Sequence, residues 1–179
     1  TCRLSSLHYN SSSDVIIAII YQLISRLYLN IKFLILDFDG VLTDNRVYVN
    51  QHGEETVACH RGDGWGIKLL KEASIEIVVL STESNPVVSV RTDKLGIKCW
   101  QNCNDKGAAV KNLIEEKSIN PDNVMYVGND TNDAEAMALV GFPAAPADAH
   151  PDILQLAKII TKAKGGYGVV RELATLLIG

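Results

Sequence analysis

Two carboxylates, Asp37 and Asp39, follow a largely apolar run of strand length, residues 31–36, and Gly40 comes next. The length and β-branched content of the run indicate a buried strand. Side chains alternate along a strand, so the i, i+2 spacing predicts that both carboxylates point to the same side. Carboxylates that close resist joint ionisation unless a positive charge separates them, and Mg²⁺ is the usual solution. A capped turn after a core strand would give the same short pattern, so the pair needs support from the rest of the chain.

Polar residues recur at three more points where a predicted element begins or ends: Ser81, Lys106, and the cluster of Asn129, Asp130 and Asp133. Taken singly, they are consistent with a turn serine, a surface lysine and the cap of the next helix. Lysine is, however, poorly placed against the positive end of a helix dipole. Because parallel strands place their ligands at their carboxyl ends, we expect these side chains to converge with the two aspartates at one sheet edge.

This combination suits phosphoryl transfer through a covalent aspartyl phosphate. A carboxylate is a competent nucleophile for phosphorus. A metal ion and a fixed lysine would offset the repulsion between the carboxylate and the phosphate ester. A serine and backbone N–H groups can bind the phosphate oxygens, while a second carboxylate protonates the leaving alkoxide and later deprotonates water.

The elements that would position these residues alternate between strands and helices. This alternation predicts an α/β fold of the Rossmann-like, doubly wound, parallel-sheet type. A β-hairpin is expected over 45–60, beside the two aspartates. The expected strands are 31–36, 75–80, 97–100, 124–127, 141–145 and 159–160, and the expected helices are 65–73, 87–95, 105–117, 134–140, 151–157 and 169–178.

The domain organisation predicted from the sequence is an N-terminal extension or linker over 1–30 and one domain over 31–179. Residues 15–29 are apolar nearly all round, which suggests a helix. Their uninterrupted apolar part is short and Arg26 lies within the stretch, so a buried or subunit-facing helix is favoured over a membrane span or signal peptide.

Composition and charge restrict the class of partner. The 179 residues are 47% hydrophobic and 21% charged, with a net charge of −4. Without a block of lysine or arginine, no nucleic-acid surface is expected, and an anionic substrate needs positive charge supplied locally. The four cysteines lack the spacing of a zinc set. Free thiols in a reducing cytoplasm are the preferred interpretation.

The sequence resembles the haloacid dehalogenase superfamily over residues 31–179. The stretch 37–44 (Asp-Phe-Asp-Gly-Val-Leu-Thr-Asp) resembles the first motif, Ser81 the second, Lys106 the third, and residues 128–133 the fourth. Residues 40–44, 60–67 and 165–172, with the hairpin, resemble the small-cap 3-deoxy-D-manno-octulosonate 8-phosphate phosphatases. Residues 80–86 and 128–130 are more similar to relatives associated with acylneuraminate cytidylyltransferases, which are expected to act on N-acylneuraminate 9-phosphates.

The resemblance implies a role for each motif residue. It makes Asp37 the nucleophile and Asp39 the general acid and base. It also implies a small hairpin insert in place of a large cap domain. The implied phosphate-binding residues are Ser81, Thr82 and Lys106; the implied Mg²⁺ ligands are Asp37, the Asp39 carbonyl, Asn129 and Asp130; and Asp133 would orient Lys106 or a metal-bound water.

One position departs from the family pattern, because Asn129 stands where an aspartate ligand is usual. An amide oxygen still coordinates Mg²⁺ but brings no charge, and Asp130 is the candidate to compensate. The departure leaves open reduced metal affinity, a shifted ligand set, or a weakly active domain.

The small-cap branch also implies a homotetramer whose sites are completed by neighbouring subunits. Arg171 is then a candidate for a substrate carboxylate or phosphate, because guanidinium binds such groups bidentately. The weaker candidates for sugar contacts are His60, Arg61, Asp63 and Glu83. Of these, Arg61 and Asp63 are equally consistent with a structural turn.

The function predicted from the sequence is Mg²⁺-dependent hydrolysis of a phosphorylated 2-keto sugar acid, either eight-carbon or nine-carbon. The alternative is a tetramerisation or regulatory module of a sugar-nucleotide system, with a cytidylyltransferase as partner. A phosphomutase is less favoured because it normally needs a larger cap to exclude water, and a dehalogenase has little use for Asp39.

Overall fold

The computed structural model describes residues 30–178, and its central feature is a six-stranded sheet with the order β5-β4-β1-β6-β7-β8. Every neighbouring pair is parallel. The predicted doubly wound parallel sheet is therefore confirmed. The helix expected over 15–29 lies outside the described residues. The strands are β1 Phe33–Leu36, β4 Glu76–Leu80, β5 Lys98–Trp100, β6 Val124–Val127, β7 Phe142–Ala145 and β8 Ile159–Ile160.

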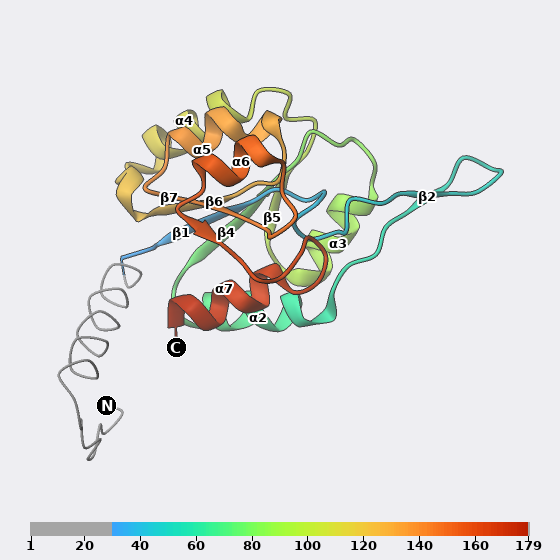
Figure 1. Ribbon diagram of the computed structural model, residues 1–179, viewed down its shortest axis with the longest axis horizontal. Helices are drawn as coiled ribbons and strands as arrows, with labels where there is room; N and C mark the ends of the chain where they lie inside the picture. Colours follow the sequence, from blue (N-terminus) through green and yellow to red (C-terminus); the bar gives the residue numbers. More distant parts are fainter. Residues whose placement is uncertain (1–29, 179) are drawn as a thin grey trace, which may run out of the picture. The chain divides into compact units, whose positions relative to one another are not determined.

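Helices cover both faces of this sheet (Figure 1). One layer contains α4 (Lys106–Lys117), α5 (Ala134–Ala138) and α6 (Pro151–Leu156), and the other contains α2 (Arg61–Glu72), α3 (Val87–Leu95) and α7 (Val169–Ile178). Two short 3₁₀ turns, Pro121–Asn123 and Thr131–Asp133, flank β6. Within the described part of the chain, none of the helices combines the length and the apolar character that a membrane span requires.

The core explains why β1 is apolar throughout. Phe33 and Ile35 belong to a buried cluster with side chains of β4, α4, β6 and α5. Leu34 and Leu36 alternate with them and are just as buried, so they face the opposite layer of helices. A strand buried on both faces has no room for polar residues until it ends, which it does at Asp37.

The predicted hairpin is present and projects from the body of the protein (Figure 1). Strand β2 (Tyr48–Val49) pairs antiparallel with β3 (Glu55–Thr56), and an isolated bridge joins Thr43 to Cys59 at its base. The hairpin is too small to bury a core of its own, and its β2 side chains are exposed.

Helix α2 begins four residues before the predicted start at Trp65, because Arg61–Gly64 forms its first turn. Glycine-rich turns have low helix propensity, which is why the sequence favoured a loop. The structure supplies two compensations. The His60 ring accepts a hydrogen bond from the N–H of Gly62 and caps the helix. Asp63 is buried and accepts a hydrogen bond from the backbone N–H of Arg171 at the start of α7.

Close packing of α2 on α7 predicts that Gly66→Ala destabilises the protein. A Cβ at position 66 would lie 2.7 Å from the carbonyl oxygen of Val170 and 2.9 Å from the Cα of Arg171. Because these are backbone atoms, the helices must separate, and we expect the free energy of unfolding to fall by about 1–3 kcal/mol. Urea unfolding followed by circular dichroism measures this difference.

Gly64→Ala is the matched control in the same helix. Its Cβ would meet only the end of the Leu95 side chain, at 3.2 Å, which can move aside. The gain in helix propensity should make this variant neutral or more stable by up to about 1 kcal/mol. Equal destabilisation of the two variants would contradict the packing argument.

Candidate active site

The predicted functional residues converge at the carboxyl ends of three adjacent strands. Asp37 directly follows β1, Ser81 follows β4, and Asn129 lies two residues beyond β6. A cavity of about 300 Å³ opens at this edge. All the residues that line it are of polar or charged type: Asp37, Asp39, Asn45, Thr82, Asn129, Asp130, Thr131 and Asn132.

Asp39 reaches the cavity by a different route from the one predicted. The strand ends at Leu36, so Asp39 lies in a turn rather than on a strand. In this turn, the backbone N–H groups of Leu42 and Thr43 both donate to the carbonyl oxygen of Phe38. The prediction that both carboxylates face one site is therefore confirmed, but turn geometry, and not strand alternation, brings Asp39 there.

Lys106 is buried between two carboxylates. Its Nζ lies 2.8 Å from Oδ1 of Asp37 and 2.7 Å from Oδ1 of Asp133, and its side chain is 1% exposed. Burial lowers the pKa of Lys106, but the neighbouring carboxylates of Asp37 and Asp133 outweigh burial and raise it. The ammonium is therefore charged, which resolves the unfavourable position of a lysine at the start of α4.

The pKa of Asp37 is raised to about 7, first by burial and then by the charge of Asp133, against the opposing effect of Lys106. One ammonium thus faces two buried carboxylates, leaving the group one positive charge short when both are ionised. The site therefore favours additional positive charge beside Asp37.

Asp133 anchors the group through both of its oxygens. Oδ1 accepts hydrogen bonds from Lys106 and, at 2.8 Å, from the hydroxyl of Tyr126. Oδ2 accepts from the backbone N–H groups of Asn129 and Asp130, at 2.9 and 3.3 Å. This arrangement holds Lys106 and the loop after β6 in place.

Tyr126 is the member of this network that the sequence reasoning missed. It lies in the apolar run of β6 and is fully buried. Burial and the nearby carboxylates raise its pKa well above the usual value, so it stays protonated and donates. The available signal was a tyrosine in a strand buried on both faces, since a buried hydroxyl needs a hydrogen-bond partner.

The loop after β4 presents Thr82 to the cavity. Ser81 is buried, and its Oγ accepts a hydrogen bond from the backbone N–H of Glu83, whereas Thr82 is exposed and lines the cavity. Glu83 bends back on its own loop, where Oε1 accepts from the N–H groups of Ser84 and Asn85 at 2.6 and 2.9 Å. These bonds fix the loop between β4 and α3.

Asn129 and Asp130 differ in what they face. Asn129 is 9% exposed, and the inner end of its carboxamide lies 3.1 Å from Oδ2 of Asp37 and 2.8 Å from the carbonyl oxygen of Asp39. Asp130 is exposed at the rim and uses Oδ1 to cap the following 3₁₀ turn through the N–H of Thr131. Within residues 30–178, no three His, Cys, Asp or Glu side chains gather into a metal cluster. The groups that converge here are the Asp37 carboxylate, the Asp39 backbone carbonyl and the Asn129 carboxamide.

The surroundings of Asp39 favour its protonated form more than water does. Burial raises its pKa, the hydrogen bond from the Thr43 hydroxyl at 3.3 Å lowers it, and the charges of Glu83 and Glu55 raise it further. The net shift is upward. Its carboxyl is half-buried and borders the cavity, so it can exchange a proton with a bound molecule.

None of the predicted substrate contacts lines this cavity. Glu83 follows Thr82 in the loop after β4, and Asp63 is buried in the first turn of α2, whereas His60, Arg61 and Arg171 lie at the starts of α2 and α7. The His60 ring caps the start of α2, and the Arg171 backbone N–H donates to Asp63 of α2. Arg61 is exposed in the first turn of α2. Within one copy of the chain, therefore, His60, Arg61 and Arg171 are not brought to the carboxylates.

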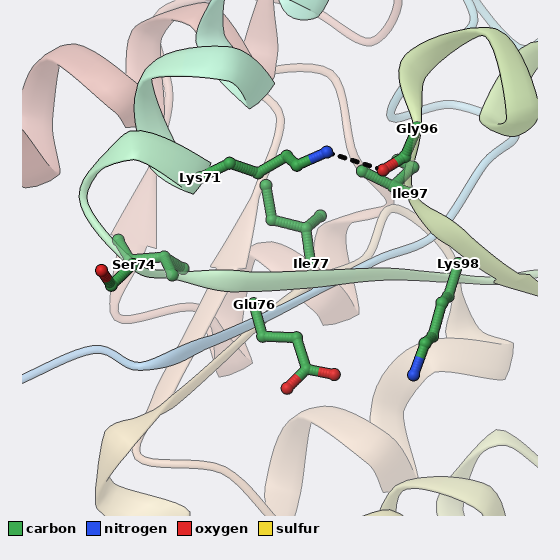
Figure 2. A pocket seen from close by; sticks show the side chains of 8 residues that line it. Lys71, Ser74, Glu76, Ile77, Gly96, Ile97 and Lys98 are labelled. Atoms are coloured by element: carbon green, nitrogen blue, oxygen red, sulfur yellow. Dashed lines mark hydrogen bonds between the residues drawn. The ribbon is translucent and has the colours of Figure 1, made fainter.

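A second cavity, of about 360 Å³, lies around the opposite ends of β4 and β5 (Figure 2). Lys71 donates to the carbonyl oxygen of Gly96 at 2.7 Å. Figure 2 shows Lys71 and Ile77 on one side of β4, with Glu76 and Lys98 on the other. Glu76 is already paired with Lys117. Because its charged groups diverge, this cavity lacks the convergence that marks the first one.

The fold and site have counterparts in known proteins. Residues 67–173 match the family model of the haloacid dehalogenase-like hydrolases (Hydrolase_3). The chain therefore belongs to the haloacid dehalogenase-like hydrolases. The matched segment contains Ser81, Lys106 and Asp133, whereas Asp37 and Asp39 precede it.

Named relatives point to one branch of the family. The chain is 40% identical over 150 residues to the 3-deoxy-D-manno-octulosonate 8-phosphate phosphatase KdsC of Escherichia coli K12, covering 83% of this chain and 80% of that protein. A haloacid dehalogenase family hydrolase from Streptomyces avermitilis is 44% identical, with a TM-score of 0.82 and coverage of 84% of this chain and 86% of that one. The 3-deoxy-D-manno-octulosonate 8-phosphate phosphatase of Moraxella catarrhalis, solved with magnesium, phosphate and 3-deoxy-D-manno-octulosonate (KDO), has a TM-score of 0.83 at 30% identity, with coverage of 88% and 91%.

The raised pKa of Asp37 predicts a pH-dependent gap in stability between the wild type and Asp37→Asn in EDTA. The folded pKa of about 7 lies above the ordinary 3.8, so folding favours the protonated form. This contribution is present below about pH 4 and is lost as pH rises through 7. Asparagine does not titrate, so the melting temperature of Asp37→Asn should gain on the wild type across this range, by the equivalent of a few kcal/mol.

Thermal melts at half-unit intervals from pH 4 to 8 measure the gap, with Glu116→Gln on the exposed face of α4 as the control. The control removes a carboxyl that is not buried and should run parallel to the wild type. If the melting temperature of Asp37→Asn minus that of the wild type stays constant or falls as pH rises from 4 to 8, burial does not control this carboxyl.

Proposed function

We propose that this protein is a Mg²⁺-dependent phosphatase that hydrolyses a phosphorylated 2-keto sugar acid through an aspartyl-phosphate intermediate on Asp37. The observation that carries the proposal is the buried Lys106, held 2.8 Å from Asp37 and 2.7 Å from Asp133 beside an open polar cavity. This arrangement places fixed positive charge where an anionic phosphoryl group must approach a carboxylate.

In the first step, an oxygen of Asp37 attacks phosphorus, and the bond from phosphorus to the ester oxygen breaks. Lys106 offsets the charge that gathers on the phosphoryl oxygens. The leaving alkoxide takes the proton of the Asp39 carboxyl, whose pKa is raised by burial. Thr82, exposed on the cavity wall, donates to the phosphoryl group, and the buried Ser81 positions that loop.

In the second step, Asp39 acts as a base. Its carboxylate takes a proton from a water molecule whose oxygen attacks the phosphorus of the intermediate. The bond between phosphorus and the Asp37 oxygen breaks, which releases phosphate and restores the Asp37 carboxylate. Asp133 stays outside these bond changes, because both of its oxygens are occupied in holding Lys106, Tyr126 and the loop after β6.

The oxygen set beside Asp37 fits Mg²⁺. Adjacent ligands of an octahedral Mg²⁺, at about 2.0–2.1 Å from the ion, lie about 2.8–3.0 Å apart. The inner end of the Asn129 carboxamide is 2.8 Å from the Asp39 carbonyl oxygen and 3.1 Å from Oδ2 of Asp37. Asp37, the Asp39 carbonyl and Asn129 would therefore hold the ion, with Asp130 at the rim. When bound, Mg²⁺ supplies the positive charge that the site lacks and polarises a phosphoryl oxygen.

The substrate class rests on the named relatives, which are 3-deoxy-D-manno-octulosonate 8-phosphate phosphatases. We assign the eight-carbon acid as the first candidate. Residues 80–86 and 128–130, which resemble relatives of the acylneuraminate cytidylyltransferase systems, make an N-acylneuraminate 9-phosphate the second. The free thiols of Cys59, Cys99 and Cys103 are consistent with a reducing compartment, and we assign the activity to the cytoplasm.

We further propose that the protein assembles as a homotetramer through its hairpin. Val47, Tyr48 and Val49, at the start of the hairpin and along β2, are 51%, 54% and 63% exposed, which is unusual for three consecutive apolar side chains. Burial against a second copy would remove this surface from water. It would also bring a neighbour's side chains towards the cavity, where candidates from one copy, such as Arg171, are missing from the lining.

Asp37→Asn should reduce phosphate release by more than about 1,000-fold, because an amide is a poor nucleophile for phosphorus. Phosphate release from KDO 8-phosphate with Mg²⁺ measures activity, and circular dichroism checks folding. Glu116→Gln should retain full activity. Full activity in folded Asp37→Asn would exclude the aspartyl-phosphate mechanism.

A substrate panel separates the proposed activities from the non-enzymatic alternative. We expect kcat/KM to be highest for either KDO 8-phosphate or an N-acylneuraminate 9-phosphate, and lower for simple hexose 6-phosphates that lack the carboxylate. The measurement is free phosphate at equal substrate and Mg²⁺ concentrations. No release from any sugar-acid phosphate, by a protein that still assembles, would favour a regulatory or tetramerisation module.

Val49→Asp should weaken the assembly, because a carboxylate on β2 cannot be buried against an apolar neighbour without a large desolvation cost. Sedimentation velocity should show a smaller species than the wild type. Ile160→Asp is the control, since Ile160 is 52% exposed on β8 at the far edge of the sheet. A change in mass for Ile160→Asp alone would place the interface elsewhere.

A further inference from the structure

The Asn129 carboxamide has two ends in different surroundings. The inner end faces only acceptors, Oδ2 of Asp37 at 3.1 Å and the carbonyl oxygen of Asp39 at 2.8 Å. The outer end faces only donors and packs against Gly40, where a Cβ would collide with it. The side chain is almost fully buried, so these surroundings, rather than water, decide which way the amide turns.

With Nδ2 at the inner end, the amide makes good hydrogen bonds without any cation. Nδ2 has two hydrogens, and it donates one to Asp37 and the other to the Asp39 carbonyl. Oδ1 then faces the donors at the outer end. With Oδ1 at the inner end and Asp37 ionised, three oxygens converge with no hydrogen between them, which is unfavourable unless a cation lies among them.

We propose that Asn129 is a two-position switch, in which Nδ2 faces inward in the cation-free protein and Oδ1 turns inward when a divalent cation binds. The proposal rests on the proposed Mg²⁺ site and adds a step to it. A cation must displace two hydrogen bonds before the amide oxygen can coordinate it. The cation-free site is in turn stabilised by those same hydrogen bonds, which hold Asp37 and the Asp39 turn together.

Aspartate cannot perform this switch. Both of its ends are oxygens, so an ionised aspartate at position 129 would always place an oxygen against Asp37 and the Asp39 carbonyl. Such a site would bind a divalent cation more tightly, because it carries an extra charge and has no hydrogen bonds to break. It would also be less stable when empty. Compared with aspartate, asparagine at position 129 therefore gives a lower affinity for the cation and a more stable cation-free site.

The direct test is the side-chain amide of Asn129 in ¹⁵N-labelled wild-type protein. Its ¹H–¹⁵N resonances are identified by their disappearance in Asn129→Asp, or in Asn129→Ala if the aspartate variant does not fold. Addition of MgCl₂ to EDTA-treated protein should shift these resonances, because the two hydrogens leave Asp37 and Asp39. If backbone amides of the site shift and the Asn129 side-chain resonances do not, the amide does not turn.

The second test compares Asn129→Asp with Asn132→Asp. Asn132 lines the same cavity and is exposed, so it controls for the added charge. Calorimetric titration with MgCl₂ should show binding at least about tenfold tighter for Asn129→Asp than for the wild type, and a smaller change for Asn132→Asp. In EDTA, only Asn129→Asp should have a lower melting temperature. A wild-type affinity or an unchanged EDTA melting temperature for Asn129→Asp would overturn the switch.

These measurements are independent of phosphatase activity. An amide that turns in a protein that releases no phosphate would support the switch and remove the proposed function. An active phosphatase whose Asn129 amide does not respond to Mg²⁺ would support the proposed function and exclude the switch. If the wild-type protein binds no Mg²⁺ at all, the switch and the Mg²⁺ dependence both fail.

Discussion

The site depends on one interaction, the buried contact of Lys106 with Asp37 and Asp133. Lys106 and Asp133 have almost no exposed side-chain surface, and Asp37 has little. Removing one member of such a group leaves a buried charge without its partner, which costs on the order of 3–5 kcal/mol. The three residues come from the end of β1, the start of α4 and the turn after β6. The ion contacts thus join elements distant in sequence, and the parallel sheet brings those elements to one edge.

The two carboxylates that contact Lys106 have different surroundings, and the difference separates their roles. Asp133 uses both oxygens for four contacts with Lys106, Tyr126 and the backbone of the loop, and it is fully buried. Asp37 directs Oδ1 to Lys106 and keeps Oδ2 at the cavity beside Asn129. One carboxylate is therefore saturated and positions the lysine, while the other keeps an oxygen facing the cavity.

The fold was predictable because the buried strands β1, β4 and β6 each end abruptly in polar residues or a glycine turn, and this signal is local in the sequence. Signals that depend on distant partners were missed or misplaced. Helix α2 starts at Arg61 because Asp63 accepts a hydrogen bond from the start of α7, more than a hundred residues later in the chain. Local helix propensity contains no information about that contact. Tyr126 resembled any other residue of an apolar strand until Asp133 was placed beside its hydroxyl. Asp39 reached the predicted place through a turn that strand periodicity does not describe.

The composition of the cavity limits what one copy of the chain can recognise. Its lining contains three carboxylates, three amides and two threonines, without a lysine or arginine among these described residues. Lys106 lies beneath it and is already shared between Asp37 and Asp133. A sugar acid carries a carboxylate besides its phosphate, and this lining has no cationic side chain to pair with it. Under the proposed function, recognition of that carboxylate would come from residues outside this lining, and the exposed apolar side chains of the hairpin are the proposed surface through which a second copy would approach.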